Sequence, residues 1–187
     1  MLQTAFPDRT QTQNSNGRAR LLLALATLLA GAAFGAPAAT ARDLVTYSSD
    51  ASPGTIVINA SERRLYLVVG DGVAVSYPVA VPKRGKEWAG VTSISAKYVR
   101  PDWIPPSDVK QDHPELPNYI PGGSPHNPMG VRALALGEGQ VAIHGTTNKM
   151  RRSIGTAASY GCIRMLNEDI VDLYERVNVG APVVMNP

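Results

Sequence analysis

A single cysteine, Cys162, and a histidine 18 residues before it, His144, are the two residues of this 187-residue chain best suited to covalent chemistry. A thiolate attacks carbonyl carbons, and a neighbouring imidazole can accept the thiol proton at neutral pH. We therefore expect a catalytic pair in which the pKa of the thiol is lowered. Gly161 allows a tight turn, so that the backbone N–H groups of Gly161 and Cys162 can point at a developing oxyanion. The alternative is a buried, inert cysteine that packs as a small hydrophobic residue.

Strands on either side of a glycine turn would position the histidine. Residues 131–137 and 140–145 alternate as a hairpin does, with Gly137-Glu138-Gly139 as its turn, so His144 lies at a strand end. A sheet holds such a side chain rigidly, which favours a fixed catalytic geometry. Residues 146–160 then form a polar loop that leads to the cysteine.

A helix is expected after the cysteine. Ile170, Leu173, Tyr174 and Val177 form one apolar face over residues 168–178, and Asn167 is placed to cap the helix. Gly180 ends it, and residues 182–186 supply a last strand.

Four further strands are predicted in the first half, over residues 55–60, 64–69, 73–81 and 91–99. Short strands at regular spacing indicate a mostly β protein, a sandwich or barrel rather than a parallel sheet.

Residues 100–130 hold eight of the fifteen prolines. A loop this long inside one domain is either functional or disordered. Its apolar residues argue for order because they can pack: Trp103, Ile104, Leu116, Tyr119 and Ile120. We expect an ordered lid or wall over the site, with His113 and His126 as ordinary loop residues.

The N-terminus has the pattern of an export signal. Three arginines precede an uncharged apolar run over residues 21–36, and small residues follow at 36–41. This order of charged, apolar and small residues is that of a secretory signal peptide. The alternative is a retained N-terminal anchor, which the shortness of the run disfavours.

We therefore assign residues 1–41 to a signal peptide cleaved after Ala38 or Ala41, residues 42–54 to a lead-in, and residues 55–187 to one catalytic domain. We expect an exported protein without a stable membrane anchor after cleavage. A lone cysteine in an oxidising environment outside the cytoplasm forms no internal disulfide.

Charge and metal-ligand patterns exclude some functions. Removing residues 1–41 takes away three basic residues and one acidic residue, so the formal charge falls from +3 to +1 and gives no case for nucleic acid. Three scattered histidines without a second cysteine make no zinc pattern, and we expect no metal or organic cofactor. Lys149, Arg151 and Arg152 form a basic cluster that suits anionic peptides, although a solvated loop is the simpler interpretation.

The segments IHGT (143–146) and SYGCIRM (159–165), with the spacing between them, resemble the L,D-transpeptidase catalytic domain, a YkuD-type family, in its Gram-negative branch. The resemblance extends to the first hairpin and to PDWIPP, LPNYIPGG and NPMGVRALAL, and covers Thr55 to Val184. It implies a sandwich or barrel-like β fold with a long proline-rich loop and one C-terminal helix.

The resemblance also implies catalytic roles. Cys162 matches the acylated nucleophile, His144 its base, and Gly145 the residue whose carbonyl orients the imidazole in place of a triad carboxylate. The N–H groups of Gly161 and Cys162 match the oxyanion hole.

Three further positions match the substrate side of the site: Arg164, Ser159 and Tyr160. Tyr160 departs from the family, which often has histidine there. Because the upstream His144 is retained, we expect activity. Tyr160 can offer a hydroxyl or a wall to the substrate, and the alternative is an aromatic side chain that only packs.

The activity that the resemblance implies is acyl transfer on peptidoglycan. Cys162 would attack a stem tetrapeptide, release D-alanine and pass the acyl group to an amine of a second stem or of a protein to be anchored. Two alternatives remain: a carboxypeptidase or hydrolase that uses the same thioester, and a non-catalytic wall-binding module.

Overall fold

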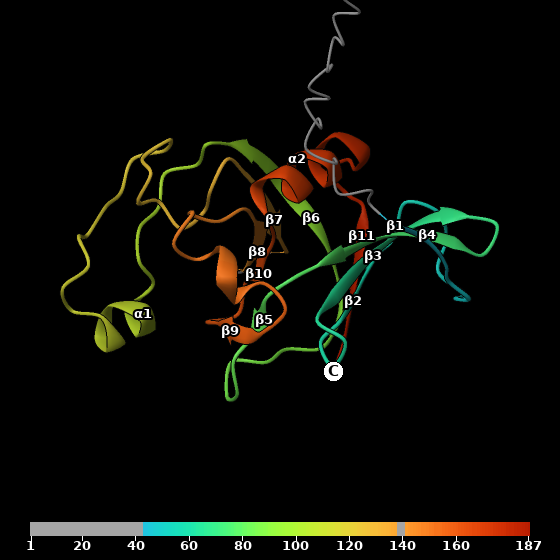
Figure 1. Cartoon of the computed structure of the whole chain (residues 1–187), viewed down its shortest axis with the longest axis horizontal. Coiled ribbons are helices and arrows are strands. Elements are labelled where there is room, and N and C mark those ends of the chain that lie inside the picture. The colour runs from blue at the N-terminus through green and yellow to red at the C-terminus, as the bar shows by residue number, and fades with distance from the viewer. Residues whose placement is uncertain (1–42, 138–140) are drawn as a thin grey trace, which may run out of the picture. The chain divides into compact units, whose positions relative to one another are not determined.

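The structure, a computed structural model, describes residues 43–137 and 141–187 (Figure 1). The predicted signal peptide and the middle of the predicted Gly137-Glu138-Gly139 turn lie outside these residues. The elements in chain order are β1 Asp43–Thr46, β2 Ile56–Asn59, β3 Arg64–Gly70, β4 Val73–Pro78, β5 Val81–Pro82, β6 Gly90–Val99, α1 Ser107–Asp112, β7 Arg132–Leu136, β8 Ala142–His144, a 3-10 turn Arg151–Ser153, β9 Ala157–Ser159, β10 Ile163–Arg164, α2 Asn167–Arg176 and β11 Pro182–Asn186. None of the helices within this part of the chain has the length and apolar character needed to cross a bilayer.

Nine strands form one large sheet in the order β1-β4-β3-β2-β11-β6-β7-β8-β10. The long strand β6 joins its two halves: its first residues pair with β11, and its last residues pair with β7. The register of β6 with β7 shifts between Ile94 and Ala96, and such an irregularity bends a strand and increases its twist. The predicted mostly β fold is confirmed.

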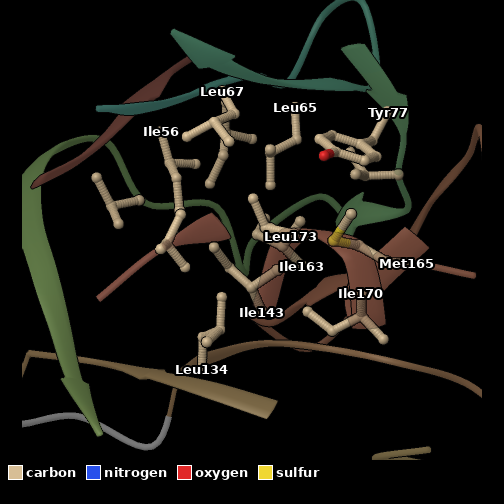
Figure 2. Close-up of a cluster of buried hydrophobic side chains, with 14 of the residues drawn as sticks. Ile56, Leu65, Leu67, Tyr77, Leu134, Ile143, Ile163, Met165, Ile170 and Leu173 are labelled. Atoms are coloured by element: carbon tan, nitrogen blue, oxygen red, sulfur yellow. The ribbon is translucent and has the colours of Figure 1, made fainter. Parts of the chain in front are cut away.

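The core lies between the two halves of the sheet and α2 (Figure 2). The first half contributes Ile56, Leu65, Leu67 and Tyr77, the second contributes Leu134, Ile143 and Ile163, and α2 and its approach contribute Met165, Ile170 and Leu173. Burying each such side chain stabilises the fold by about 1.5–3 kcal/mol, so the core holds the second half of the sheet, and with it β8 and β10, in a fixed place.

Most strand pairs in the described part of the chain are antiparallel, but three are parallel. β11 pairs parallel with β2, β10 with β8, and β5 with β9. Each of these pairs joins strands far apart in sequence, and strand propensity alone does not predict direction. The parallel β8–β10 pair matters most, because it aligns the segment after Cys162 with the strand that ends at His144.

Two predicted segments differ in detail. The strand expected over residues 73–81 is divided into β4 and β5, and the lead-in contains β1, which pairs with β4. The added strand extends the sheet at its edge.

The start of α2 also differs from the prediction. Leu166, not Asn167, is the N-cap, and no side chain caps the helix by a hydrogen bond. Asn167 is the first helical residue, and its amide bonds to backbone outside the helix. At the other end, Lys97 Nζ donates to the carbonyl oxygens of Tyr174 and Val177 at 2.6 and 2.7 Å, which suits the negative end of a helix.

The proline-rich segment between β6 and β7 contains the short helix α1 and a backbone bridge between Trp103 and Ile120. The buried amide of Asn127 ties it together: Nδ2 donates to the carbonyl of Pro101 at 2.9 Å, and Oδ1 accepts the Met129 N–H at 2.9 Å. None of the residues of α1 is buried.

Candidate active site

The parallel pairing of β8 and β10 places the segment that follows Cys162 beside the strand that ends at His144. Ile163 lies opposite Ile143, and Arg164 lies opposite His144. Ile143 and Ile163 both point into the core. Since alternate residues of a strand share a face, His144 and Arg164 lie on the other face of this pair, and Cys162 directly precedes β10.

The His144 imidazole is oriented by the backbone. It is 4% exposed, and its Nδ1 lies 2.8 Å from the carbonyl oxygen of Gly145. A carbonyl only accepts, so Nδ1 carries the proton and Nε2 is left as the basic nitrogen. Burial first, and the Arg164 cation second, lower the pKa of His144 to about 4, although the carbonyls of Gly145 and Pro128 act in the opposite direction. His144 is therefore neutral at pH 7 and able to accept a proton.

The expectation of a lowered thiol pKa is wrong for the resting protein. Burial raises the pKa of Cys162, and this outweighs a hydrogen bond with the Ala142 backbone and the Arg164 cation, which both lower it. At neutral pH the pair is a thiol and a neutral imidazole, not a thiolate and an imidazolium. Such a pair reacts by transferring the proton during attack, as a serine and histidine do.

Arg164 supplies the positive charge of the site. Its backbone pairs with Ala80 in both directions, at 2.8 and 2.9 Å, and its Nη1 donates to Ser153 Oγ at 2.9 Å. Its Nε is buried and has no hydrogen-bond partner within the described part of the chain. Burial lowers the pKa of Arg164, yet a guanidinium stays charged at any physiological pH.

A short network shapes the loop that carries the thiol. Ser159, which is 1% exposed, donates through Oγ to the Cys162 carbonyl and accepts the Gly161 N–H at 3.3 Å. Gly161 has a φ of +129°, which favours glycine, and Trp88 Nε1 donates to its carbonyl at 2.8 Å. Ser159 thus holds the loop rather than facing a substrate. The Gly161 N–H, one expected oxyanion donor, already has an internal acceptor.

A cavity of about 320 Å³ opens onto the thiol. Its walls are mainly apolar and come from the proline-rich segment, with one carboxylate: Asp102, Trp103, Ile104, Pro106, Met129 and Cys162. A half-buried thiol at the end of an apolar groove can receive an extended peptide.

Tyr160 connects the thiol loop to α1. Its hydroxyl donates to Asp112 Oδ2 at 2.6 Å, and Lys83 Nζ lies 3.5 Å from the centre of its ring and 3.3 Å from the same carboxylate oxygen. A second ion pair, Lys86 to Asp108 at 2.6 Å, holds α1 from the same side. Tyr160 therefore acts as a contact for the proline-rich segment.

The other candidate residues lie outside this cluster. His113 contacts the edge of the Tyr160 ring, with the centroids 6.3 Å apart, and His126 does not line the cavity. Arg151 of the basic cluster forms a bidentate pair with Glu168 at 2.7 and 3.0 Å. Within residues 43–137 and 141–187, no group of three or more His, Cys, Asp or Glu side chains could hold a metal ion.

The sequence analysis did not identify Trp88, Asp102 and Asp112 as contacts of the site. It predicted Asn167 only as a helix cap. Nothing in the local sequence of the first three residues marks them, because each reaches the site from a distant segment. For Asn167 the sequence held one indirect signal, the glycines Gly130 and Gly145. In the structure both lie against the Asn167 amide, and neither has a side chain that would keep it away.

Comparison with known proteins identifies the family to which this fold belongs. Residues 53–185 match the family model of the L,D-transpeptidase catalytic domain, YkuD. A curated relative, described as a probable L,D-transpeptidase ErfK/SrfK from Escherichia coli (strain K12), is 36% identical over 137 residues, which is 68% of this chain and 42% of the relative. The chain thus spans less than half the length of that relative.

Solved structures share the fold. An L,D-transpeptidase from Mycobacterium smegmatis superposes with a TM-score of 0.57 at 19% identity, over 71% of this chain and 58% of that one. A structure from Brucella melitensis, described as a probable carnitine operon oxidoreductase, has a TM-score of 0.51 at 42% identity, over 74% and 88% of the two chains. The name of the latter points to redox chemistry, whereas the family model and the E. coli relative are L,D-transpeptidases.

Proposed function

The chain belongs to the L,D-transpeptidase catalytic domain family, and from this premise we propose that it is an exported peptidoglycan L,D-transpeptidase that acts through a thioester on Cys162. The observation that supports the proposal is the pairing of β8 with β10, which sets His144 beside the segment that follows Cys162. A cavity at the thiol and the hydrogen bond of His144 Nδ1 to the Gly145 carbonyl add to it. A thiol, an oriented base and a groove are what acyl transfer needs.

The first step is acylation. Cys162 Sγ attacks the carbonyl carbon at the L-to-D bond of a stem tetrapeptide, while its proton moves to His144 Nε2. The backbone N–H of Cys162 would stabilise the oxyanion of the tetrahedral intermediate, because the Gly161 N–H already donates to Ser159 Oγ. When the intermediate collapses, His144 gives the proton to the leaving amine, the C–N bond breaks, and D-alanine departs to leave the thioester on Cys162.

Arg164 supports this sequence through its charge. It favours the thiolate and disfavours the imidazolium, as its effects on both pKa values show. The proton accepted by His144 is therefore held weakly and passes readily to the leaving amine. Arg164 also offers a cation for a carboxylate of the stem peptide.

The second step transfers the acyl group. An acceptor amine, from a second stem or from a wall-anchored protein, gives a proton to His144 and attacks the thioester carbonyl. The thiolate leaves and is protonated again. The signal peptide of residues 1–41 would bring the domain to the periplasm, where these substrates are found.

The deciding experiment incubates the chain without residues 1–41 with a disaccharide tetrapeptide and analyses products and intact protein by mass spectrometry. A protein adduct that lacks D-alanine, together with cross-linked dimers, supports the transpeptidase. Free tripeptide alone indicates the hydrolytic alternative. Unchanged tetrapeptide, with a folded protein and a free thiol, overturns the proposal and favours a binding module; Cys162→Ala is the matched control.

A further inference from the structure

The peptide unit between Gly145 and Thr146 makes hydrogen bonds at both of its ends. Its carbonyl, on Gly145, accepts the His144 Nδ1 proton at 2.8 Å. Its N–H, on Thr146, donates to Asn167 Oδ1 at 3.0 Å. One rigid plane thus links the imidazole to an amide at the start of α2.

Both the oxygen and the nitrogen of the Asn167 amide form hydrogen bonds to this peptide unit or to backbone next to it. Besides the Thr146 N–H, Oδ1 accepts the Val131 N–H at 3.3 Å, and Nδ2 donates to the Thr146 carbonyl at 2.9 Å. Three hydrogen bonds from one side chain to the backbone leave it no freedom to rotate. The amide therefore fixes the direction of the peptide plane that it holds.

Two glycines leave the space that the Asn167 amide occupies. A Cβ on Gly145 would lie 2.2 Å from Asn167 Oδ1, and a Cβ on Gly130 would lie 2.4 Å from the same atom. Gly145 therefore serves two purposes: its carbonyl meets the histidine, and its missing side chain admits Asn167.

We propose that Asn167 is a positioning residue for His144, acting through the Gly145–Thr146 peptide unit. The inference rests on the proposed function for its effect on catalysis, but not for its effect on the histidine. The acceptor on Thr146 N–H aligns and polarises the peptide, so its carbonyl is a stronger acceptor for Nδ1–H. The result is an imidazole locked in the tautomer that leaves Nε2 free for the thiol proton.

A carboxylate in a serine-histidine-aspartate triad does the same orienting work. Here an uncharged chain of amide, peptide and imidazole performs it. This suits a buried histidine, because the chain adds no charge that would have to be desolvated.

The test is the tautomer of His144, read from the ¹⁵N shifts of its ring in the chain without residues 1–41, at pH 7.5. His144→Gln identifies the signals among the three histidines. We expect wild type to be protonated at Nδ1, and Asn167→Ala to populate the Nε2–H tautomer and slow acylation by about ten- to a hundredfold, the scale seen when partners that orient a functional histidine are removed. Asn59→Ala, which removes an amide that accepts the Glu62 N–H far from the site, should leave the tautomer unchanged.

Two further variants keep the test decisive. Asn167→Asp retains the acceptor for Thr146 N–H and should retain the Nδ1–H tautomer, also where Asn167→Ala does not fold. Gly145→Ala should disturb the tautomer as Asn167→Ala does, and the double variant should be no worse than Gly145→Ala alone, because the clashing oxygen is gone. If Asn167→Ala lowers only the melting temperature, or Asn167→Asp loses the tautomer although folded, the proposal is overturned. An inactive wild type with the expected tautomer shift would contradict the proposed function but not this inference.

Discussion

Arg164 lies directly opposite His144 in the parallel pairing of β10 and β8, and its guanidinium lowers the pKa of the imidazole. The same cation lowers the pKa of the Cys162 thiol against the larger effect of burial. One half-buried positive charge thus favours loss of a proton from both members of the proposed pair. It is held in place by its backbone pairing with Ala80 and by Ser153 Oγ.

Replacing His144 by alanine should lower the acylation rate by roughly two orders of magnitude or more, the usual contribution of a positioned base. The rate is measured as the growth of the thioester adduct by intact-protein mass spectrometry. His113→Ala is the matched control, since His113 contacts Tyr160 rather than the cavity, and it should acylate at nearly the wild-type rate. Equal losses in the two variants would contradict the assignment.

The pH dependence of stability should show the buried histidine. The pKa of His144 is about 4 in the folded chain against 6.5 for the free side chain, so between these values the unfolded chain binds the extra proton. Stability contributed by the neutral imidazole is therefore fully present above pH 6.5 and falls as the pH drops to 4, by roughly 3 kcal/mol in total. Urea unfolding at steps from pH 7 to pH 4 measures it, and His144→Gln should remove this part of the slope.

The thiol should react slowly with a neutral alkylating agent. Because burial raises the pKa of Cys162, less thiolate is present at pH 7.5 than in a free cysteine peptide. Iodoacetamide should alkylate the folded chain more slowly than such a peptide, and Arg164→Gln should be slower still because the cation is lost. Alkylation faster than in the peptide would indicate a thiolate–imidazolium pair and contradict this prediction.

Tyr160→Phe should make the α1 part of the proline-rich segment more mobile while largely preserving the acylation of Cys162. The change deletes the hydroxyl that donates to Asp112, and α1, which has no buried residue, is then held mainly by the exposed ion pairs of Lys83 and Lys86. Hydrogen exchange of the α1 amides should rise several-fold, while acylation falls far less than in His144→Ala. A loss of acylation as large as that of His144→Ala would instead make the tyrosine part of the chemistry.

Gly161→Ala should cost both stability and acylation. A φ of +129° strains any other residue, by about 1–3 kcal/mol, although space is available because the nearest atom to a Cβ is 3.7 Å away. Gly155→Ala is the matched control: its φ is +85° and nothing lies within 4 Å of a Cβ. It should lose comparable stability in urea unfolding but keep acylation, since it does not shape the thiol loop.

Much of the fold follows from local patterns. Alternation and turn residues were enough to locate β2, β3, β6, β7 and β11 and the body of α2, because a strand or helix exposes its period directly in the sequence. The pairing directions were not accessible in this way. The parallel β8–β10 contact depends on where the chain returns to the sheet after the loop 146–160. That position is set by the packing of core residues from both strands, such as Ile143 and Ile163.

The residue types of the site were also evident from the sequence: a lone thiol, a strand-end histidine, and the glycines beside them. Their energetics were not. The pKa of Cys162 is raised because the effect of burial outweighs that of the Arg164 cation. The cavity at the thiol is walled by Asp102, Trp103, Ile104, Pro106 and Met129, which are distant from Cys162 in the sequence.

Asn167 shows the division most clearly. Its place before an apolar helical face predicts a cap, which is a local rule, yet its amide bonds instead to Val131 and Thr146, from segments 36 and 21 residues away. Sequence by itself determined which groups can do chemistry and which stretches become strands or helices, because those depend on near neighbours. Only the tertiary structure decided protonation, orientation and partners, because desolvation and long-range hydrogen bonds exist only once distant segments are packed together.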